Sequence, residues 1–196
     1  MLLTYPLRVA ILSAEINPFV TCLPPGLSAG RRRQEGVKNM PNKFSNFFRL
    51  NAAAVITDGE GRVLAFERAD QAGSWQCAQG GCNDGEAFLD CFYRELKEET
   101  EIPRRFLKLL AEYPSLLLYE FPKKVRDPKK GRGQAQKWFV FRLAKGGTKS
   151  IDFNGHGKPE FRAWKWTTMK QLTREVVPFK RDIYKLLCKD FSKFLK

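Results

Sequence analysis

Acidic side chains crowd one short stretch of a strongly basic chain. Of 196 residues, 35 are Lys or Arg and 21 are Asp or Glu, which gives a formal net charge of +14. Residues 84–101 reverse this balance, because they hold seven acids and only two bases. Crowded carboxylates repel one another, so we expect a compensating partner. Hard divalent cations such as Mg²⁺ or Mn²⁺ prefer carboxylate oxygens and would remove the repulsion.

Three of these acids share one side of a predicted helix over residues 87–100. Apolar residues recur there at the spacing of a single helical face: Phe88, Cys91, Phe92 and Leu96. Because each helical residue turns by about 100°, Glu95, Glu98 and Glu99 fall within an arc of roughly 100°. A solvated acidic face is the ordinary explanation of such an arc. The Gly-rich segment before the helix and the basic rest of the chain favour a metal site instead.

The rest of the composition narrows the classes of function. The chain is 43% hydrophobic and contains sixteen Phe and four Trp, which is enough for a packed core. It contains no run of 18 apolar residues, so we expect neither a transmembrane helix nor a membrane partner. Its basic excess favours polyanionic partners such as nucleotides, polyphosphates or RNA.

Cysteine and histidine usage argues against other kinds of site. Five cysteines stand without any C-x-x-C spacing, so we expect no zinc site, no disulfide framework and a reducing compartment. The single histidine, His156, lies in the turn-like segment NGHG and is predicted to be a surface residue. Catalysis by a Ser-His-Asp triad or a Cys-His pair is therefore not expected.

Residues 1–43 differ in composition from the rest. They carry six bases against two acids and include the segment LPPGLSAGRRRQEG, without a lasting amphipathic period. A basic leader poor in acids is typical of an organelle transit peptide. A disordered extension, or translation that starts at Met40, explains the same pattern. If residues 1–43 are a transit peptide, we expect a chloroplast or mitochondrial protein. Under either of the other two explanations, we expect a cytoplasmic protein.

Residues 44–196 are predicted to form one domain of the α/β class. The apolar runs at residues 52–57 and 62–66 flank DGEG and indicate a β-hairpin. The segment GSWQCAQGGCNDGEAF is predicted to be a loop because of its glycines. Residues 179–196 are amphipathic and predict a C-terminal helix. Four more strands are predicted, at residues 106–113, 115–121, 137–143 and 161–166.

The segment GGCNDGEAFLDCFYRELKEETEI, residues 80–102, resembles the Nudix box, G-x5-E-x7-R-E-U-x-E-E-x-G-U with U aliphatic. Eight of its nine constrained positions agree: Gly80, Glu86, Arg94, Glu95, Leu96, Glu98, Glu99 and Ile102. The ninth is Glu101, where the family has Gly. That Gly often follows the helix end in a left-handed conformation, and a Glu there costs about 1–2 kcal/mol. Either the turn adapts or catalysis is weakened, so a non-catalytic RNA- or nucleotide-binding Nudix module stays an alternative.

The resemblance implies a Nudix-type α/β/α sandwich with a mixed β-sheet and a hydrolase of a nucleoside diphosphate linked to another group. The loop–helix–loop of the box would be the metal and pyrophosphate site, with Mg²⁺ or Mn²⁺ as cofactor. By the same resemblance, Glu98 and Glu99 would be the main metal ligands, and Glu95 a ligand or the base that deprotonates water. Gly80 belongs to the same metal site. Glu160 would complete the metal shell from outside the box, or it is an ordinary loop acid.

Within the box, the resemblance also implies an ion pair between Arg94 and Glu86 that orients the loop and makes Arg94 part of the catalytic set. Over residues 48–194 the likeness narrows to a branch that contains RNA pyrophosphohydrolases and dinucleoside polyphosphate hydrolases. It is carried by the segments SWQCAQGG, LYEFP, GQAQKWF, PEFRAWKW and VPFKRDIY. The branch implies these substrate-binding residues: Arg49, Gln134, Gln136, Lys137, Val177 and Phe179.

The branch also implies that Phe179 stacks on a base opposite Val177; core packing of Phe179 is the alternative. Residues 123–132, KKVRDPKKGR, carry six bases and one acid, and either guide an RNA 5′ end or polyphosphate or form a solvated loop. The tryptophans predicted to lie in the core are Trp138, Trp164 and Trp166.

We therefore predict a divalent-metal-dependent hydrolase of phosphoanhydride bonds, in 5′-triphosphorylated RNA ends or in dinucleoside polyphosphates. It would bind a nucleotide or an RNA 5′ end as its substrate and work as a monomer or weak oligomer. A housecleaning nucleoside triphosphatase is the alternative enzyme, since it would use the same metal site on damaged mononucleotides.

Overall fold

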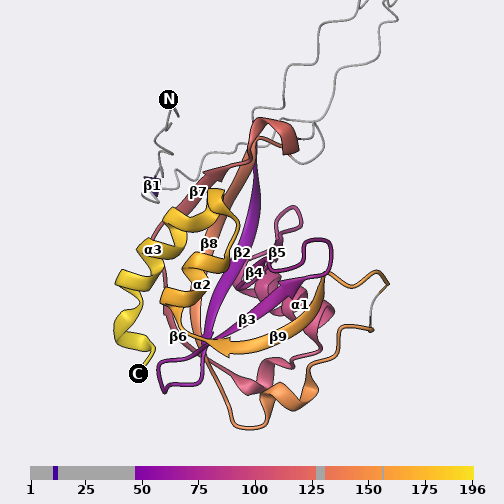
Figure 1. Cartoon of the computed structure of the whole chain (residues 1–196), viewed down its shortest axis with the longest axis vertical. Coiled ribbons are helices and arrows are strands. Elements are labelled where there is room, and N and C mark those ends of the chain that lie inside the picture. Colours follow the sequence, from indigo (N-terminus) through magenta and orange to yellow (C-terminus); the bar gives the residue numbers. More distant parts are fainter. Residues whose placement is uncertain (1–10, 13–46, 127–130, 156) are drawn as a thin grey trace, which may run out of the picture.

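The computed structural model describes residues 11–12, 47–126, 131–155 and 157–196. The expectations for residues 1–43 lie outside these ranges except at Ile11–Leu12, as do those for His156 and for residues 127–130 of the basic segment. Within the described ranges, one β-sheet lies between helices on both of its faces (Figure 1).

The sheet is built around a long parallel pair of strands. β2 (Phe48–Thr57) runs parallel to β8 (Gly133–Leu143). From Ala52 onward β2 is buried on both faces, as expected of parallel strands that are covered by helices. Every other strand pairing among the described residues is antiparallel, so the sheet is mixed.

The other described strands extend the sheet on either side of this pair. On the β8 side lie β6 (Leu107–Glu112) and β7 (Leu116–Glu120), which pair with β8, and β1 (Ile11–Leu12), which pairs with β7. On the β2 side lie β3 (Val63–Arg68) and β5 (Ala78–Gly81), which pair with β2, and β4 (Trp75–Gln76) and β9 (Phe161–Thr167), which pair with β3. Because β5 pairs directly with β2, the residues that follow β5 start close to the centre of the sheet.

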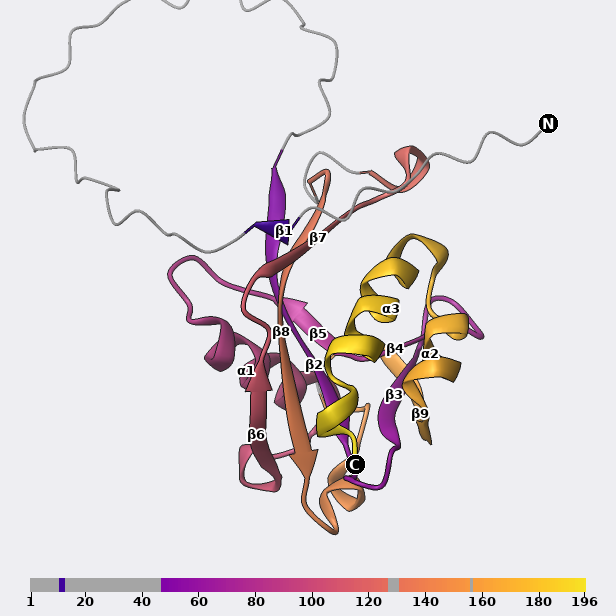
Figure 2. The ribbon, with the colours of Figure 1, turned by 90° about the vertical axis from the view of Figure 1, so that its left-hand side faces the viewer.

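Helices cover the two faces of the sheet. α1 (Phe88–Thr100) lies on one face, while α2 (Met169–Glu175) and α3 (Arg181–Asp190) lie on the other (Figure 2). Side chains alternate along each strand, so successive residues enter different cores. Val55 and Trp138 pack on the side of α2 and α3, whereas Ile56 and Phe139 pack on the side of α1. This confirms the predicted α/β/α sandwich with a mixed sheet and a C-terminal amphipathic helix.

Most predicted elements are confirmed with small shifts at their ends. The hairpin corresponds to β2 and β3, the helix at residues 87–100 to α1, and the four further strands to β6, β7, β8 and β9. The C-terminal helix is shorter than predicted, since α3 ends at Asp190. Short 3₁₀ turns complete the described chain, at Arg104–Phe106, Lys123–Val125, Gly147–Ser150, Pro178–Lys180 and Ser192–Phe194. No described helix has the length and apolar character needed to cross a membrane.

Two predictions about the fold are corrected, and one helix is not predicted. The segment GSWQCAQGGCNDGEAF, predicted to be a loop, contains β4 and β5. β5 joins the sheet through the backbone of two glycines, so its side chains give no alternating pattern. α2 is not predicted, because its seven residues are too few for a clear helical period. Trp138 is fully buried as predicted and Trp166 packs against the core on the side of α1, but Trp164, on the edge strand β9, is 36% exposed.

The end of α1 keeps a left-handed turn with Glu101 in place of Gly. Glu101 follows the last helical residue with φ +59° and ψ +9°. Its backbone N–H donates to the carbonyl of Lys97 at 3.0 Å, as expected of a left-handed residue that ends a helix. The side chain forms an ion pair with Lys97. The turn therefore does not change its conformation to suit Glu, and the backbone carries a cost of about 1–2 kcal/mol.

Replacing Glu101 by Gly and by Ala separates this backbone cost from the side-chain contacts. Both variants lose the ion pair with Lys97, but only Gly relieves the left-handed strain. We expect Glu101→Gly to be more stable than Glu101→Ala by about 1 kcal/mol, after the greater entropy of unfolded Gly is included. Urea denaturation of the two variants measures the difference. Equal free energies of unfolding would show that residue 101 is not held in the left-handed region.

Candidate active site

The acidic side of α1 opens onto a polar cavity of about 370 Å³. The segment between β5 and α1, the start of β2 and one residue just before β9 also line it. Six of the predicted site residues line this cavity: Arg49, Gly80, Glu95, Glu99, Gln134 and Glu160. These residues come from five separate parts of the sequence, so the fold brings half of the predicted site residues to one cavity.

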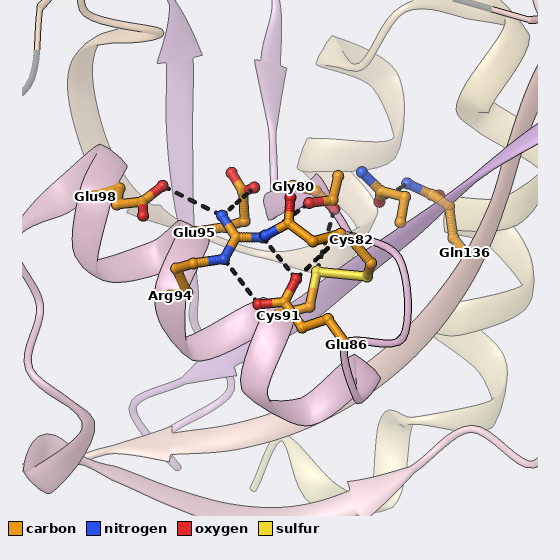
Figure 3. Close-up of a disulfide and its surroundings, with 11 residues drawn as sticks. Gly80, Cys82, Glu86, Cys91, Arg94, Glu95, Glu98 and Gln136 are labelled. Atoms are coloured by element: carbon orange, nitrogen blue, oxygen red, sulfur yellow. Dashed lines mark hydrogen bonds and ion pairs between the residues drawn. A yellow bond between two sulfur atoms is a disulfide. The ribbon is translucent and has the colours of Figure 1, made fainter.

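Arg94 is the centre of the polar network beside this cavity (Figure 3). Its guanidinium donates two hydrogen bonds of 2.8 Å to Glu86, one of 3.0 Å to the Gly81 carbonyl and one of 2.7 Å to Glu95. A contact of 3.3 Å reaches Glu98. The hydrogen bonds from Arg94 lower the pKa of Glu86 to about 2. The predicted Glu86–Arg94 ion pair is thereby confirmed, and it holds the loop against the helix.

Gly80 lies where β5 comes closest to the acidic side of α1. A Cβ atom at this position would collide with the side chain of Glu95, which would then have to leave its present place. At Gly81 a Cβ atom would lie 2.8 Å from Nη2 of Arg49. The two glycines therefore make room for one acidic and one basic side chain at the wall of the cavity.

A disulfide joins the same loop to α1. Cys82, which lines the cavity, is bonded to Cys91, which is completely buried on the helix. The expectation of no disulfide framework therefore missed this bond. The two cysteines are nine residues apart and fit no spacing motif; they meet because the loop folds back over the first turn of α1. Cys77 and Cys188 are free.

Three carboxylates concentrate negative charge in the cavity. Burial raises the pKa of Glu95 above its ordinary value, although the nearby Arg94 opposes the shift. Burial, together with the charges of Glu160 and Glu95, raises the pKa of Glu99 to about 10. Oε2 of Glu99 is buried and has no hydrogen-bond partner among the described residues. A donor set made of crowded oxygens fits a hard divalent cation, which would satisfy this atom and remove the repulsion.

Glu98 faces a second hollow, of about 210 Å³, next to the first. Glu99 and Glu160 line both hollows, and Lys158 lines the second. The side chain of Glu98 is 49% exposed. The four predicted carboxylate ligands therefore gather around two adjoining hollows, with Glu98 on the more solvated side.

Amide side chains form the part of the cavity built by β2, β5 and β8. Nε2 of Gln136 lies 2.8 Å from Oδ1 of Asn51 and 3.1 Å from Oε1 of Gln79. The hydroxyl of Tyr119 donates to Oε1 of Gln134 at 2.5 Å. Gln134 lines the cavity directly, whereas the buried Gln136 supports Asn51 and Gln79, which line it. Sequence reasoning missed Asn51 and Gln79, because strand amides carry no motif.

Lys180 is a buried lysine that sequence reasoning also missed. Its Nζ lies 3.0 Å from Oε1 of Gln79 and 3.1 Å from Oε1 of Gln76. Burial lowers the pKa of this amine to about 7. The one signal in the sequence is its spacing from Ile183 and Tyr184, which places it in line with the buried face of α3.

Lys137, predicted to bind the substrate together with Gln134 and Gln136, lies away from the cavity. Its Nζ is 2.5 Å from Oε1 of Glu112 on β6. Neighbouring residues of a strand point to opposite faces of the sheet, so Gln136 and Lys137 cannot line the same wall.

Val177 and Phe179, predicted to hold a base, do not line the cavity either. Val177 is buried in the core under α2 and α3. The ring of Phe179 packs against Tyr119 and Phe121, with centroid distances of 5.7 Å and 6.2 Å. Core packing, the alternative for Phe179, therefore describes its position in this structure.

The described part of the basic segment at residues 123–132 is partly neutralised. Arg126 and Arg132 both form ion pairs with Glu120 on β7. Lys123 and Lys124 remain exposed in the 3₁₀ turn that follows β7. Two of the bases expected to guide a polyanion thus hold their own loop in place instead.

Comparison with known proteins identifies the family to which the chain is similar. Residues 47–187 match the model of the NUDIX domain. The RNA pyrophosphohydrolase of Shewanella frigidimarina is 40% identical over 151 residues, which cover 76% of this chain and 87% of that protein. The one from Erythrobacter litoralis is 35% identical over 153 residues, 76% of this chain and 93% of that protein.

The fold agrees with solved structures at lower sequence identity. A C. elegans Ap4A hydrolase has a TM-score of 0.56 at 21% identity and covers 75% of this chain and 97% of that one. The E. coli dihydroneopterin triphosphate pyrophosphohydrolase has a TM-score of 0.56 at 20% identity, with 73% of this chain and 98% of that one covered. Together, the domain match and the curated relatives show that the chain belongs to the Nudix hydrolase family.

Proposed function

We propose that this Nudix hydrolase acts on 5′-triphosphorylated RNA ends and cleaves a phosphoanhydride bond with the help of a divalent metal ion. The observation that carries the proposal is the convergence of Glu95, Glu99 and Glu160 on one polar cavity. Oε2 of Glu99 lacks a hydrogen-bond partner there among the described residues. The curated relatives named RNA pyrophosphohydrolase support this substrate class.

Four carboxylates would hold Mg²⁺ or Mn²⁺, with the backbone of Gly80 beside them: Glu95, Glu98, Glu99 and Glu160. When bound, such an ion polarises the phosphoanhydride and neutralises the charge on the leaving phosphate. The set contains only oxygen donors, as magnesium and manganese prefer.

The side chains of the chain itself orient the substrate and accept a proton. Arg94 keeps Glu95 at the cavity wall through its 2.7 Å hydrogen bond, and so acts as a positioning residue. The raised pKa of Glu95 makes its carboxylate a better acceptor for the proton of an attacking water. Arg49 can pair with a phosphate at the cavity, and the amide of Gln134 can bind a phosphate or ribose oxygen.

A stripe of cations on α3 favours an RNA chain as the substrate. Arg181, Lys185 and Lys189 are exposed and four residues apart, so they lie along one side of the helix. The stripe begins next to Lys180, which contacts Gln79 of the cavity wall. It extends about 12 Å along α3.

Two cations of α2 widen the same surface. Lys170 and Arg174 line a hollow between α2 and α3 together with Lys185 and Lys189. Asp182 pairs with Lys185, at 2.8 Å. Like charges at such spacing repel, and a phosphodiester chain leaving the cavity would neutralise them. A dinucleoside polyphosphate ends at its second nucleoside and has no such chain.

Replacing Glu99 by Gln tests the metal-dependent reaction. We expect Glu99→Gln to reduce kcat on a 5′-triphosphorylated RNA by about a hundredfold or more, because a neutral amide is a poor ligand for a hard cation. Asp90→Asn is the matched control, since Asp90 is an exposed acid on α1 that lines neither hollow. Release of pyrophosphate or phosphate with Mg²⁺ measures the rate. A Glu99→Gln variant with full activity would refute the proposed ligand set.

The metal-free protein should lose stability as the pH rises. Folded Glu99 keeps a proton up to about pH 10, whereas the unfolded chain releases it near pH 4.5. The folded state thus binds more protons across that window, and its stability falls with rising pH. We expect the Tm in EDTA to fall more steeply between pH 5 and 9 in the wild type than in Glu99→Gln. Added Mg²⁺ should flatten the wild-type curve; identical curves for the two proteins would contradict the prediction.

Charge reversal on α3 separates the two substrate classes. We expect Lys185→Glu with Lys189→Glu to lower kcat/KM about tenfold on a triphosphorylated RNA of ten nucleotides, but not on a dinucleoside tetraphosphate. Lys108→Glu with Lys145→Glu is the control, because it makes the same charge change at exposed lysines away from α2 and α3. The salt dependence of the RNA reaction should also become weaker. Equal losses on both substrates would contradict a path for RNA along this stripe.

A further inference from the structure

The Cys82–Cys91 disulfide lies inside the catalytic box and has no part in the proposed reaction. Figure 3 shows it beside the Glu86–Arg94 ion pair, below Gly80. Cys82 is half-buried and lines the cavity. Cys91 is completely buried on α1, one turn before Arg94 and Glu95.

The disulfide connects two parts of the site whose relative positions must stay fixed. On one side are Gly80 and Gly81 at the end of β5 and Asn83 in the loop that follows, and all three line the cavity. On the other side is the helix that carries the carboxylates. Hydrogen bonds also tie the loop down: Arg94 donates to the Gly81 carbonyl at 3.0 Å, and the backbone N–H of Asn83 donates to Glu86 at 2.9 Å. The disulfide is the covalent member of this set.

Reduction would leave the loop with weaker restraints. The sulfur of Cys91 lies 3.8 Å from the Gly80 carbonyl, so the free thiol could donate a hydrogen bond there. A thiol is a weak donor, and this contact does not restrain Cys82 or Asn83. The backbone that faces the phosphates would be less pre-organised, and orientation is a large part of the catalysis of such reactions.

The two sulfurs differ in their access to solvent. A small thiol or disulfide can reach Cys82 through the cavity, whereas Cys91 is enclosed by the core under α1. Exchange should therefore begin at Cys82. A phosphorylated ligand in the cavity would cover this sulfur and slow its reaction.

We propose that Cys82 and Cys91 are a thiol–disulfide exchange site for low-molecular-weight thiols and disulfides, and that the disulfide form is the catalytically arranged one. The Cys82 thiolate attacks a disulfide RSSR, forms Cys82–S–SR and releases RS⁻. The Cys91 thiolate then attacks the Cys82 sulfur, closes the protein disulfide and releases a second RS⁻. Two protein thiols lose two electrons and two protons, and RSSR becomes two RSH. Only the effect on activity rests on the proposed function; the exchange does not.

The test compares one enzyme preparation in both redox states. The protein is treated with glutathione disulfide or with a phosphine reductant, and its intact mass and its kcat/KM with Mg²⁺ and triphosphorylated RNA are measured. We expect the reduced form to be 2 Da heavier and about five- to tenfold less active, with full recovery on reoxidation. A redox titration should give one midpoint for the mass change and the activity change.

Cysteine variants separate this pair from the other thiols. Cys82→Ser and Cys91→Ser should both have the activity of the reduced form and no response to glutathione disulfide. Cys188→Ser is the control, because it removes the partly exposed free cysteine, and it should respond like the wild type. If Cys91→Ser does not fold, the activity of Cys82→Ser alone is compared with that of the reduced wild type. Cys82 is half-buried at the cavity, so this substitution disturbs the core less.

Substrate protection provides a readout that does not depend on turnover. A non-hydrolysable nucleoside triphosphate with Ca²⁺ should slow the reduction of the disulfide, as followed by mass. Exchange without a change in activity would refute the catalytic role and leave the exchange site standing. No exchange at Cys82, or higher activity in the reduced form, would overturn the proposal. Inactivity of both forms on every substrate would instead count against the proposed function.

Discussion

Electrostatic repulsion among carboxylates is the constraint around which this molecule is organised. Glu95, Glu99 and Glu160 share one cavity, and Oε2 of Glu99 is buried there without a hydrogen-bond partner among the described residues. Such an arrangement opposes folding unless protons or cations reduce its charge. Burial and the charges of Glu160 and Glu95 raise the pKa of Glu99 to about 10, so a proton can reduce this charge. Arg94 provides part of the compensation, and its geometry decides where Glu95 lies.

The sheet supplies the rigid support that this concentration of charge requires. β5 pairs with the centre of β2, and the two glycines at its end let α1 approach closely enough for Glu95 to lie over the backbone. Glu160 arrives just before β9, on the far side of β3. A site assembled from such distant segments depends on the packing of both cores, so its precision comes from the whole domain.

The basic side chains fall into two groups, those that form ion pairs within the structure and those that are exposed on α2 and α3. Some bases are used inside the structure: Arg94 in the box, Arg126 and Arg132 on Glu120, and Lys137 on Glu112. The exposed cations of α2 and α3 are different. Of those that line the hollow between the two helices, Lys185 forms an ion pair, with Asp182. The exposed cations of α2 and α3 lie on the face of the sheet opposite α1 (Figure 2).

The sequence by itself was sufficient for the features that depend on local spacing. The helical period placed Glu95, Glu98 and Glu99 on one side of α1, because residues of one helix have fixed relative directions. The resemblance to the Nudix box implied the ion pair of Arg94 with Glu86, which lies in the loop before that helix. The main strands and the α/β class followed from alternation and β propensity. The C-terminal helix followed from its amphipathic pattern.

Only the tertiary structure decided which distant residues share the cavity. Asn51, Gln79 and Lys180 enter or support the site through strand pairing and helix packing, for which single residues carry no pattern. Lys137 leaves it because strand alternation turns it to the other face. The Cys82–Cys91 bond forms because the loop folds back onto α1. Contacts between segments far apart in sequence depend on how the cores pack. That packing cannot be predicted from composition and local spacing alone.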